Sequence, residues 1–183
     1  WIILKGTEVK PSPMEFLVHN IIPANALTLM AGKQLSGKTW ACISLASAIS
    51  RGSLLPNGAR PEKGNVLFLH VEDNESQLME RYLQMNGDPE RIWFAPLVEQ
   101  LKNDSDIDLS SPQGLQNFKD SIIEEKIKFV VIDPLNSFLG RGADNTSSDK
   151  KMREVLGDLL KLADETKCSI LYIVHMNKSK DHK

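Results

Sequence analysis

Residues 32–39 read GKQLSGKT, which is the pattern G-x-x-x-x-G-K-T known as the Walker A motif. A loop of this form turns successive backbone N–H groups inward and makes a cradle for phosphate oxygens. Gly32 and Gly37 allow the close backbone approach and the unusual dihedral angles that the cradle needs. We expect Lys38 to reach the phosphates with its charge and the Thr39 hydroxyl to bind Mg²⁺. The motif therefore predicts a nucleotide site with ATP and Mg²⁺ as its cofactors.

The residues on either side of the motif fit a strand, a loop and a helix in that order. A short apolar run at 26–31 precedes the loop, and apolar residues recur at helical spacing between 41 and 49. A helix that starts here adds the positive end of its dipole to an anion site. The candidate cofactor-binding residues are Gly32, Lys33, Gln34, Leu35, Ser36, Gly37, Lys38, Thr39 and Trp40.

The composition is that of an ordinary globular protein. Its 183 residues suggest one α/β domain, with 41% hydrophobic and 25% charged residues. The net charge of −2 argues against a global affinity for nucleic acid, so any such contact must be local or come from other subunits. Two isolated cysteines, Cys42 and Cys168, indicate buried thiols in a reducing compartment, which predicts a cytoplasmic protein. No apolar run approaches the roughly 18 residues of a membrane span, so no membrane contact is expected.

Strands and helices are expected to alternate, which predicts a parallel sheet flanked by helices on both faces. Residues 1–15 form an irregular N-terminal arm and residues 16–183 the core. Strands are expected at 26–31, 65–71, 92–95, 129–132 and 169–175, and helices at 38–50, 74–85, 112–125 and 149–166. Loops are expected at 53–64, 99–111 and 140–148.

Asp133 is the second candidate ligand of Mg²⁺. It follows the apolar strand 129–132, and four apolar residues with an acid are the Walker B form. The strand delivers the carboxylate to the carboxyl edge of the sheet, where ligands bind in open α/β folds. Many buried strands end in this way, so the assignment depends on the motif at 32–39. With that motif present, we expect Asp133 to hold Mg²⁺ beside Thr39.

Other polar residues close the expected strands 65–71 and 169–175. Glu72 is the candidate catalytic carboxylate that orients the attacking water. Alternatively, Glu72 or Asp73 caps the helix that starts near residue 74, and Asp73 is the better candidate for this cap. His175 is a candidate sensor of the γ-phosphate, or else a solvated histidine at a strand end. His70 lies inside a strand and is expected to be a core histidine.

Three segments, taken together and in order, resemble the RecA/DnaB-type ATPases, and most closely the RepA-like hexameric helicase group. The likeness covers roughly residues 16–178. The segments are 27–39; 66–73 with Leu78 and Arg81; and 131–135 with the Asp144-Asn145 loop, the helix residues 159–163 and the strand 173–178.

The resemblance implies a RecA-like fold and assigns a role to each candidate residue. Lys38 and Thr39 would bind phosphate and Mg²⁺, and Asp133 would be the Walker B acid. Glu72 would be the catalytic glutamate, and His175 would occupy the place of a polar γ-phosphate sensor. It also implies a homo-oligomeric ring in the full-length protein, with nucleotide between subunits and an arginine from the neighbour. Relatives continue beyond the position of residue 178 with segments that touch DNA, so the core is expected to be truncated at its C-terminus.

The sequence thus predicts a Mg²⁺-dependent ATPase. By resemblance it is the core of a motor or helicase that acts on DNA, expected to be single-stranded, in replication or in a mobile element. A nucleotide-gated switch or loader with low turnover is the first alternative, favoured by the net acidity. A small-molecule P-loop kinase is the second, but only Arg141 lies in a candidate lid loop. We also expect strand 169–175 to lie between the strand before the P-loop and the strand before Asp133, so that His175, Asp133 and Lys38 share one pocket.

Overall fold

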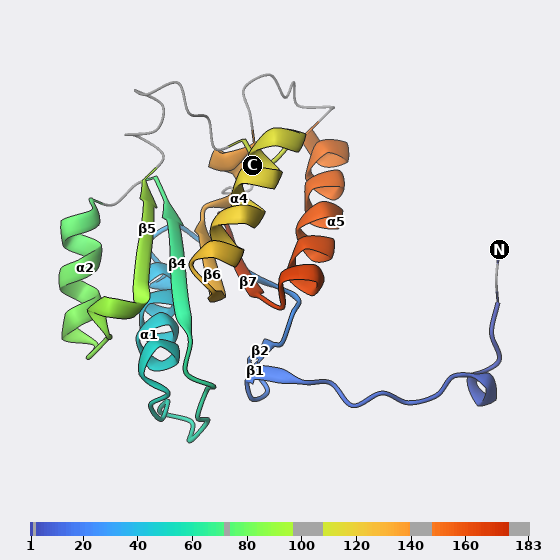
Figure 1. Cartoon of the computed structure of the whole chain (residues 1–183), viewed down its shortest axis with the longest axis horizontal. Helices are drawn as coiled ribbons and strands as arrows, with labels where there is room; N and C mark the ends of the chain where they lie inside the picture. Colours follow the sequence, from blue (N-terminus) through green and yellow to red (C-terminus); the bar gives the residue numbers. More distant parts are fainter. Residues whose placement is uncertain (2, 72–73, 97–107, 140–147, 176–183) are drawn as a thin grey trace, which may run out of the picture.

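Five parallel strands form the central sheet of the computed structural model, which describes residues 1, 3–71, 74–96, 108–139 and 148–175 (Figure 1). The strand order is β3-β7-β6-β4-β5, and every neighbouring pair is parallel. The predicted position of the last strand, between the P-loop strand and the strand of Asp133, is confirmed. The strands are β3 (Leu27–Gly32), β4 (Asn65–His70), β5 (Ile92–Pro96), β6 (Ile127–Asp133) and β7 (Ser169–His175).

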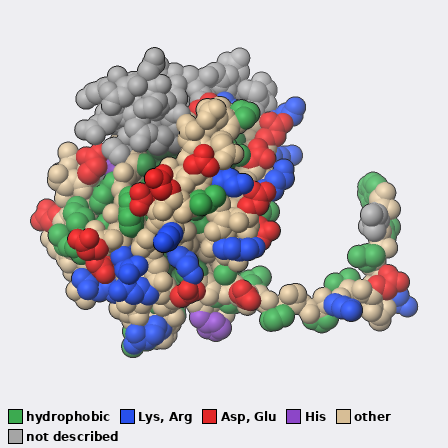
Figure 2. Space-filling model, viewed as in Figure 1, with side chains coloured by type: hydrophobic (Ala, Val, Ile, Leu, Met, Phe, Trp, Pro, Cys, Tyr) green, Lys and Arg blue, Asp and Glu red, His purple; other side chains and the backbone are tan. Residues whose placement is uncertain are grey.

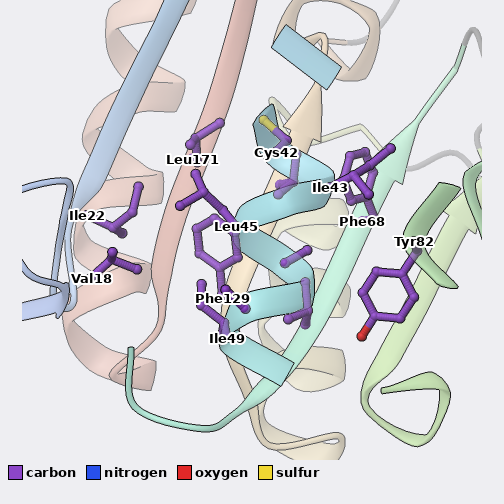
Figure 3. Packing of buried hydrophobic residues seen from close by; sticks show 14 of the residues in the cluster. Val18, Ile22, Cys42, Ile43, Leu45, Ile49, Phe68, Tyr82, Phe129 and Leu171 are labelled. Carbon is purple, nitrogen blue, oxygen red and sulfur yellow. The ribbon is translucent and has the colours of Figure 1, made fainter. Parts of the chain in front are cut away.

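Two helices cover one face of the sheet, as Figure 1 shows: α1 (Lys38–Arg51) and α2 (Glu75–Gln84). Their apolar sides and one set of strand side chains make a buried cluster, seen from close by in Figure 3. In that view Leu45 and Ile49 of α1 lie beside Phe129 of β6, Ile43 lies beside Phe68 of β4, and Tyr82 of α2 packs at the side of the cluster. The buried members from α1 are Cys42, Ile43, Leu45, Ala46, Ala48 and Ile49.

The opposite face is covered by α4 (Pro112–Glu124) and α5 (Ser148–Thr166), and it has a cluster of its own. The expected arrangement of helices on both faces is confirmed. Burial on both faces of the sheet explains why residues 129–132 of β6 are apolar without alternation. Phe129 and Val131 belong to the cluster under α1, whereas Val130 and Ile132 belong to the cluster under α4 and α5. Because successive side chains point to opposite faces, a strand covered on both sides must be apolar at every position.

The N-terminal region contains a small hairpin that was not predicted. Strands β1 (Phe16–Val18) and β2 (Ile22–Pro23) pair antiparallel, and Val18 and Ile22 are buried in the cluster under α1. The residues before the hairpin extend away from the body, with exposed apolar side chains such as Met14 (Figures 1 and 2). They include one short 3-10 turn, η1 (Gly6–Glu8).

Local capping residues stand at one end of α1 and of α4. Gly52 ends α1 in the left-handed conformation, with φ of 64°, and its N–H bonds to carbonyls of the last turn. Ser111 is the N-cap of α4, with its hydroxyl accepting from the Gly114 N–H, and Pro112 follows at the first helical position. The remaining short turns are η2 (Pro89–Arg91) and η3 (Leu135–Phe138). Most of the expected loops at 99–111 and 140–148 lie outside the described residues.

The far ends of α1 and α2 are joined by side-chain bonds. Arg51 at the end of α1 donates to the carbonyls of Asn86 and Gly87 at 2.8 and 3.2 Å. The Tyr82 hydroxyl donates to the Asp88 carbonyl at 2.9 Å. The Arg51 bonds join the end of α1 to the turn that follows α2, and the Tyr82 bond fixes that turn to α2.

Among the described residues, no helix combines the length and the apolarity that crossing a lipid bilayer requires.

Candidate functional site

The start of α1 is the centre of the candidate site. Strand β3 ends at Gly32, and α1 begins at Lys38 after a loop whose side chains are exposed. Gly37 is the N-cap residue, with φ of 86°, and no side chain of the described residues bonds to the cap. The first N–H groups of a helix have no partner within the helix. At α1 these groups, together with the helix dipole, can therefore receive an anion.

The Lys38 side chain crosses back over the loop. Its ammonium donates to the Gly32 carbonyl at 3.1 Å and to the Lys33 carbonyl at 2.7 Å, and the side chain is buried. A Cβ on residue 32 would lie 3.2 Å from Ser36 Oγ and 3.6 Å from Lys38 Cδ, so glycine leaves room for this crossing. The structure thus brings a cation to the mouth of the loop, held by carbonyls that a phosphate oxygen would replace.

Thr39 and Asp133 meet although they are far apart in the sequence. The Thr39 hydroxyl donates to Asp133 Oδ2 at 2.8 Å. A hydroxyl and a carboxylate side by side next to a phosphate cradle are oxygen donors of the kind that Mg²⁺ prefers. The donor set of this structure therefore fits Mg²⁺, and Thr39 and Asp133 are the residues that would hold it.

His175 lies at the same edge of the sheet. It is the last residue of β7 and is in register with Gly32, the last residue of β3. His70 is the last residue of β4, it is 3% exposed, and its register partner in β6 is Asp133. The expected burial of His70 is confirmed. Its position beside the candidate Mg²⁺ ligand was not predicted.

Glu72, the predicted catalytic carboxylate, lies outside the described residues, as does Asp73. The described part of the chain corrects one expectation about this segment. Asn74, not Asp73, is the N-cap of α2, because its side-chain oxygen accepts from the Ser76 N–H at 2.8 Å. Asparagine is as good an N-cap as aspartate, so composition alone favoured neither residue.

Sequence reasoning missed a contact at the border of the site. The Arg81 guanidinium lies 5.4 Å from the centroid of the Trp40 ring, which directly follows the Walker A threonine. Trp40 is 42% exposed, so part of the ring faces solvent. In the sequence Arg81 is only a mid-helix arginine, and no local signal connects it with residue 40.

Cys42 is close to this site but is not equipped for chemistry. It lies on the buried side of α1, with its sulfur 4.0 Å from the Met30 sulfur. Burial raises the pKa of the Cys42 thiol, and the negative charge of Asp133 raises it further. Burial also raises the pKa of Cys168 to about 12. Both thiols therefore stay protonated at neutral pH and serve packing, as expected for free buried cysteines.

One comparison with known families bears on this arrangement. A family model described as an AAA domain matches residues 3–181. The match spans nearly the whole chain and includes every candidate residue of the site.

Proposed function

The chain belongs to the AAA domain family of P-loop ATPases, and we propose that it binds ATP with Mg²⁺ at the start of α1. We propose further that it hydrolyses the bond between the β- and γ-phosphates. The observation that carries this proposal is the uncapped start of α1 beside the bonded pair Thr39 and Asp133. A cradle of N–H groups, a lysine and two oxygen ligands are the parts that a phosphoryl-transfer site needs.

Each residue has a defined role in this proposal. Lys38 exchanges its bonds to the loop carbonyls for bonds to the β- and γ-phosphates. Thr39 and Asp133 hold Mg²⁺, which neutralises charge on the phosphates when bound. Glu72 orients the attacking water, and His175 bonds to the γ-phosphate. Catalysis would then consist of positioning and charge stabilisation.

The biological role that we propose is a DNA-dependent motor or helicase core in the cytoplasm, acting in replication or in a mobile element. The support is the resemblance of the motif set to ring-forming helicases. A ring would also supply a cation in trans, as the resemblance implies, and three arginines of the described residues make their bonds elsewhere. Arg51, Arg60 and Arg91 donate to oxygens near the amino ends of the strands, away from the start of α1. Arg141 lies outside the described residues.

Binding and turnover test the proposal separately. Titration calorimetry should detect ATP binding that strengthens with Mg²⁺. Phosphate release per subunit should rise with protein concentration as assemblies form, with mass followed by light scattering. Single-stranded DNA should increase the rate further. A protein that binds no ATP at millimolar concentration would refute the whole proposal, whereas a rate independent of concentration and of DNA would refute only the ring and the motor.

A nucleotide-gated switch or loader is the second candidate. The observation in its favour is the net charge of −2, with Lys, Arg, Asp and Glu side chains interspersed on the face seen in Figure 2. Such a surface offers no broad attraction to polyanions. If ATP binds tightly but DNA leaves the turnover unchanged, the switch becomes the better description.

A further inference from the structure

The N-terminal arm is the part of the molecule that the proposed reaction does not use. It precedes the hairpin β1–β2 and extends away from the body of the protein (Figure 1). A run of exposed apolar side chains, unlike a scattered single one, marks an interaction site. The exposed apolar side chains of the arm are Trp1, Ile3, Leu4, Val9 and Met14.

Two prolines separate the apolar start of the arm from the protein's own sheet. Residues 10–13 read KPSP. Proline fixes its own φ, and it biases the residue before it toward extended backbone. A segment of this kind acts as a stiff spacer of about 3.1 Å per residue. Because the spacer leads away from the body, the apolar residues before it are better placed to contact another molecule than their own core (Figure 1).

The edge strand β3 offers a surface that can receive such a segment. Its only strand partner among the described residues is β7, so the main-chain groups on its outer side have no described ladder partner. Edge strands are usually blunted by a charge or a proline, and β3, with the sequence LTLMAG, has neither. Leu27 packs against the cluster under α4 and α5, whereas Leu29, two residues later on the same side, is 53% exposed. The other edge strand, β5, is less suited, because residues 92–95 are all half-buried.

We propose that the arm of one copy adds as a strand to the outer edge of β3 in a second copy. Trp1 and Ile3 are of residue types that favour strands, and one face of the added strand would cover Leu29. In strand addition, main-chain hydrogen bonds supply affinity and alternate side chains supply specificity. The two surfaces differ, so the contact is heterologous, and repeated contacts of this kind form a ring where the rotation closes. The inference rests on the proposed function only in supposing that copies assemble, and it does not require ATP.

Light scattering of the whole chain over a range of concentrations tests the contact. The double variant Ile3→Asp with Leu4→Asp, and separately Leu29→Asp, place unpaired charge in the apolar contact. Each should raise the concentration at which half of the protein is assembled by about 10-fold or more. Ile123→Asp is the matched control, because Ile123 is 56% exposed but lies on α4, which packs against α5 and β6. This variant should assemble as the wild type does.

Cysteine pairs test the geometry of the contact. Protein with Leu29→Cys is mixed with protein that has either Ile3→Cys or Leu4→Cys, and disulfides between unlike chains are identified by peptide mass mapping. The native cysteines are buried, so they do not compete. Because neighbouring residues of a strand point to opposite faces, one of the two arm positions should cross-link to residue 29 several-fold more than the other.

A wild type that stays monomeric at the highest concentration measured would overturn the inference, as would equal weakening by Ile123→Asp. Cross-linking to residue 29 that is equal from residues 3 and 4, or absent from both, would also overturn it. If Leu29→Asp does not fold, the arm variant and the cross-links decide. Calorimetry with ATP separates this inference from the proposed function. Assembly through the arm without ATP binding would refute the function alone, whereas ATP binding with assembly that ignores these substitutions would refute the contact alone.

Discussion

Helices α1 and α4 begin at the same edge of the sheet, yet a side chain caps the first turn of α4 and none of the described side chains caps that of α1. At α4 the Ser111 hydroxyl accepts from the Gly114 N–H at 3.0 Å, so the cap is closed by the chain itself. The start of α2 is closed in the same manner by Asn74. At α1 the N-cap is Gly37, and no described side chain accepts from the first turn. Asn74 and Ser111 are extended and carry capping side chains, whereas Gly37 is left-handed and leaves the first N–H groups of α1 open to the proposed ligand.

The difference indicates what sets the proposed ligand site apart from an ordinary helix start. Every helix has a dipole and first-turn N–H groups without a partner in the helix, so these features alone do not explain the contrast. What differs is a glycine in place of a capping side chain, together with a cation and a carboxylate brought to the same point. Lys38 comes from α1 itself, whereas Asp133 is brought by β6.

The largest effect, on ATP turnover, should come from Glu72→Gln. This variant tests whether the uncapped start of α1 supports ATP hydrolysis or only ATP binding. The amide keeps the size of the side chain but cannot polarise water, so turnover should fall by about 10²–10⁴-fold while Mg²⁺·ATP affinity is kept. Phosphate release and titration calorimetry measure the two quantities. Asp73→Asn is the control, and a larger loss there would transfer the catalytic role to Asp73.

Lys38→Ala tests the contribution of the Lys38 ammonium to ATP binding at the uncapped start of α1. Charge-assisted hydrogen bonds contribute about 1.5–3 kcal/mol, so ATP affinity should fall by roughly 10–100-fold. Lys33→Ala removes the same charge from the other end of this loop, where the side chain is exposed, and should lower the affinity far less. Equal affinities of the wild type and Lys38→Ala in calorimetry would contradict the assignment of this loop.

Ser111→Ala tests the side-chain cap at the start of α4. Losing the hydroxyl that accepts from Gly114 should lower the free energy of unfolding by about 1 kcal/mol, without changing ATP affinity. Urea denaturation measures the loss. Ser121→Ala is the matched control, because Ser121 is an exposed serine inside the same helix whose hydroxyl bonds to the Asn117 carbonyl and does not cap the first turn. The comparison fails if both variants lose the same stability.

The smallest effect concerns strain in the open loop. Leu35 has φ of 62° and its side chain is fully exposed, an arrangement that glycine tolerates better than leucine. Leu35→Gly should raise the free energy of unfolding by less than about 1 kcal/mol, because relief of strain is partly offset by the entropy of the unfolded chain. Leu35→Val should lower it, since a branched side chain is least tolerated at positive φ. A loss of stability in Leu35→Gly comparable to that in Leu35→Val would contradict this reading.

The place of the last strand, between the P-loop strand and the strand of Asp133, was predicted correctly, whereas the positions of β4 and β5 in the sheet were not predicted. The apolar runs, the glycines at 32 and 37 and the acid at 133 identified the strand ends at one edge. The hairpin β1–β2 escaped prediction because its strands are short and contain no Asn-Gly or similar turn signal. The cap of α2 was placed one residue early, because Asp73 and Asn74 have the same local chemistry and only the backbone path selects between them.

The sequence by itself determined the chemistry of the start of α1, because a phosphate loop is local: its glycines, lysine and threonine act within eight consecutive residues. Only the tertiary structure decided which distant groups join it. The contacts of Thr39 with Asp133 and of Trp40 with Arg81, and the place of His70 beside Asp133, depend on strand register and helix packing. A shift of one residue in β4 or β6 would turn the side chain of His70 or Asp133 to the other face of the sheet. Register is set by burial over the whole sheet, and no short stretch of sequence contains that information.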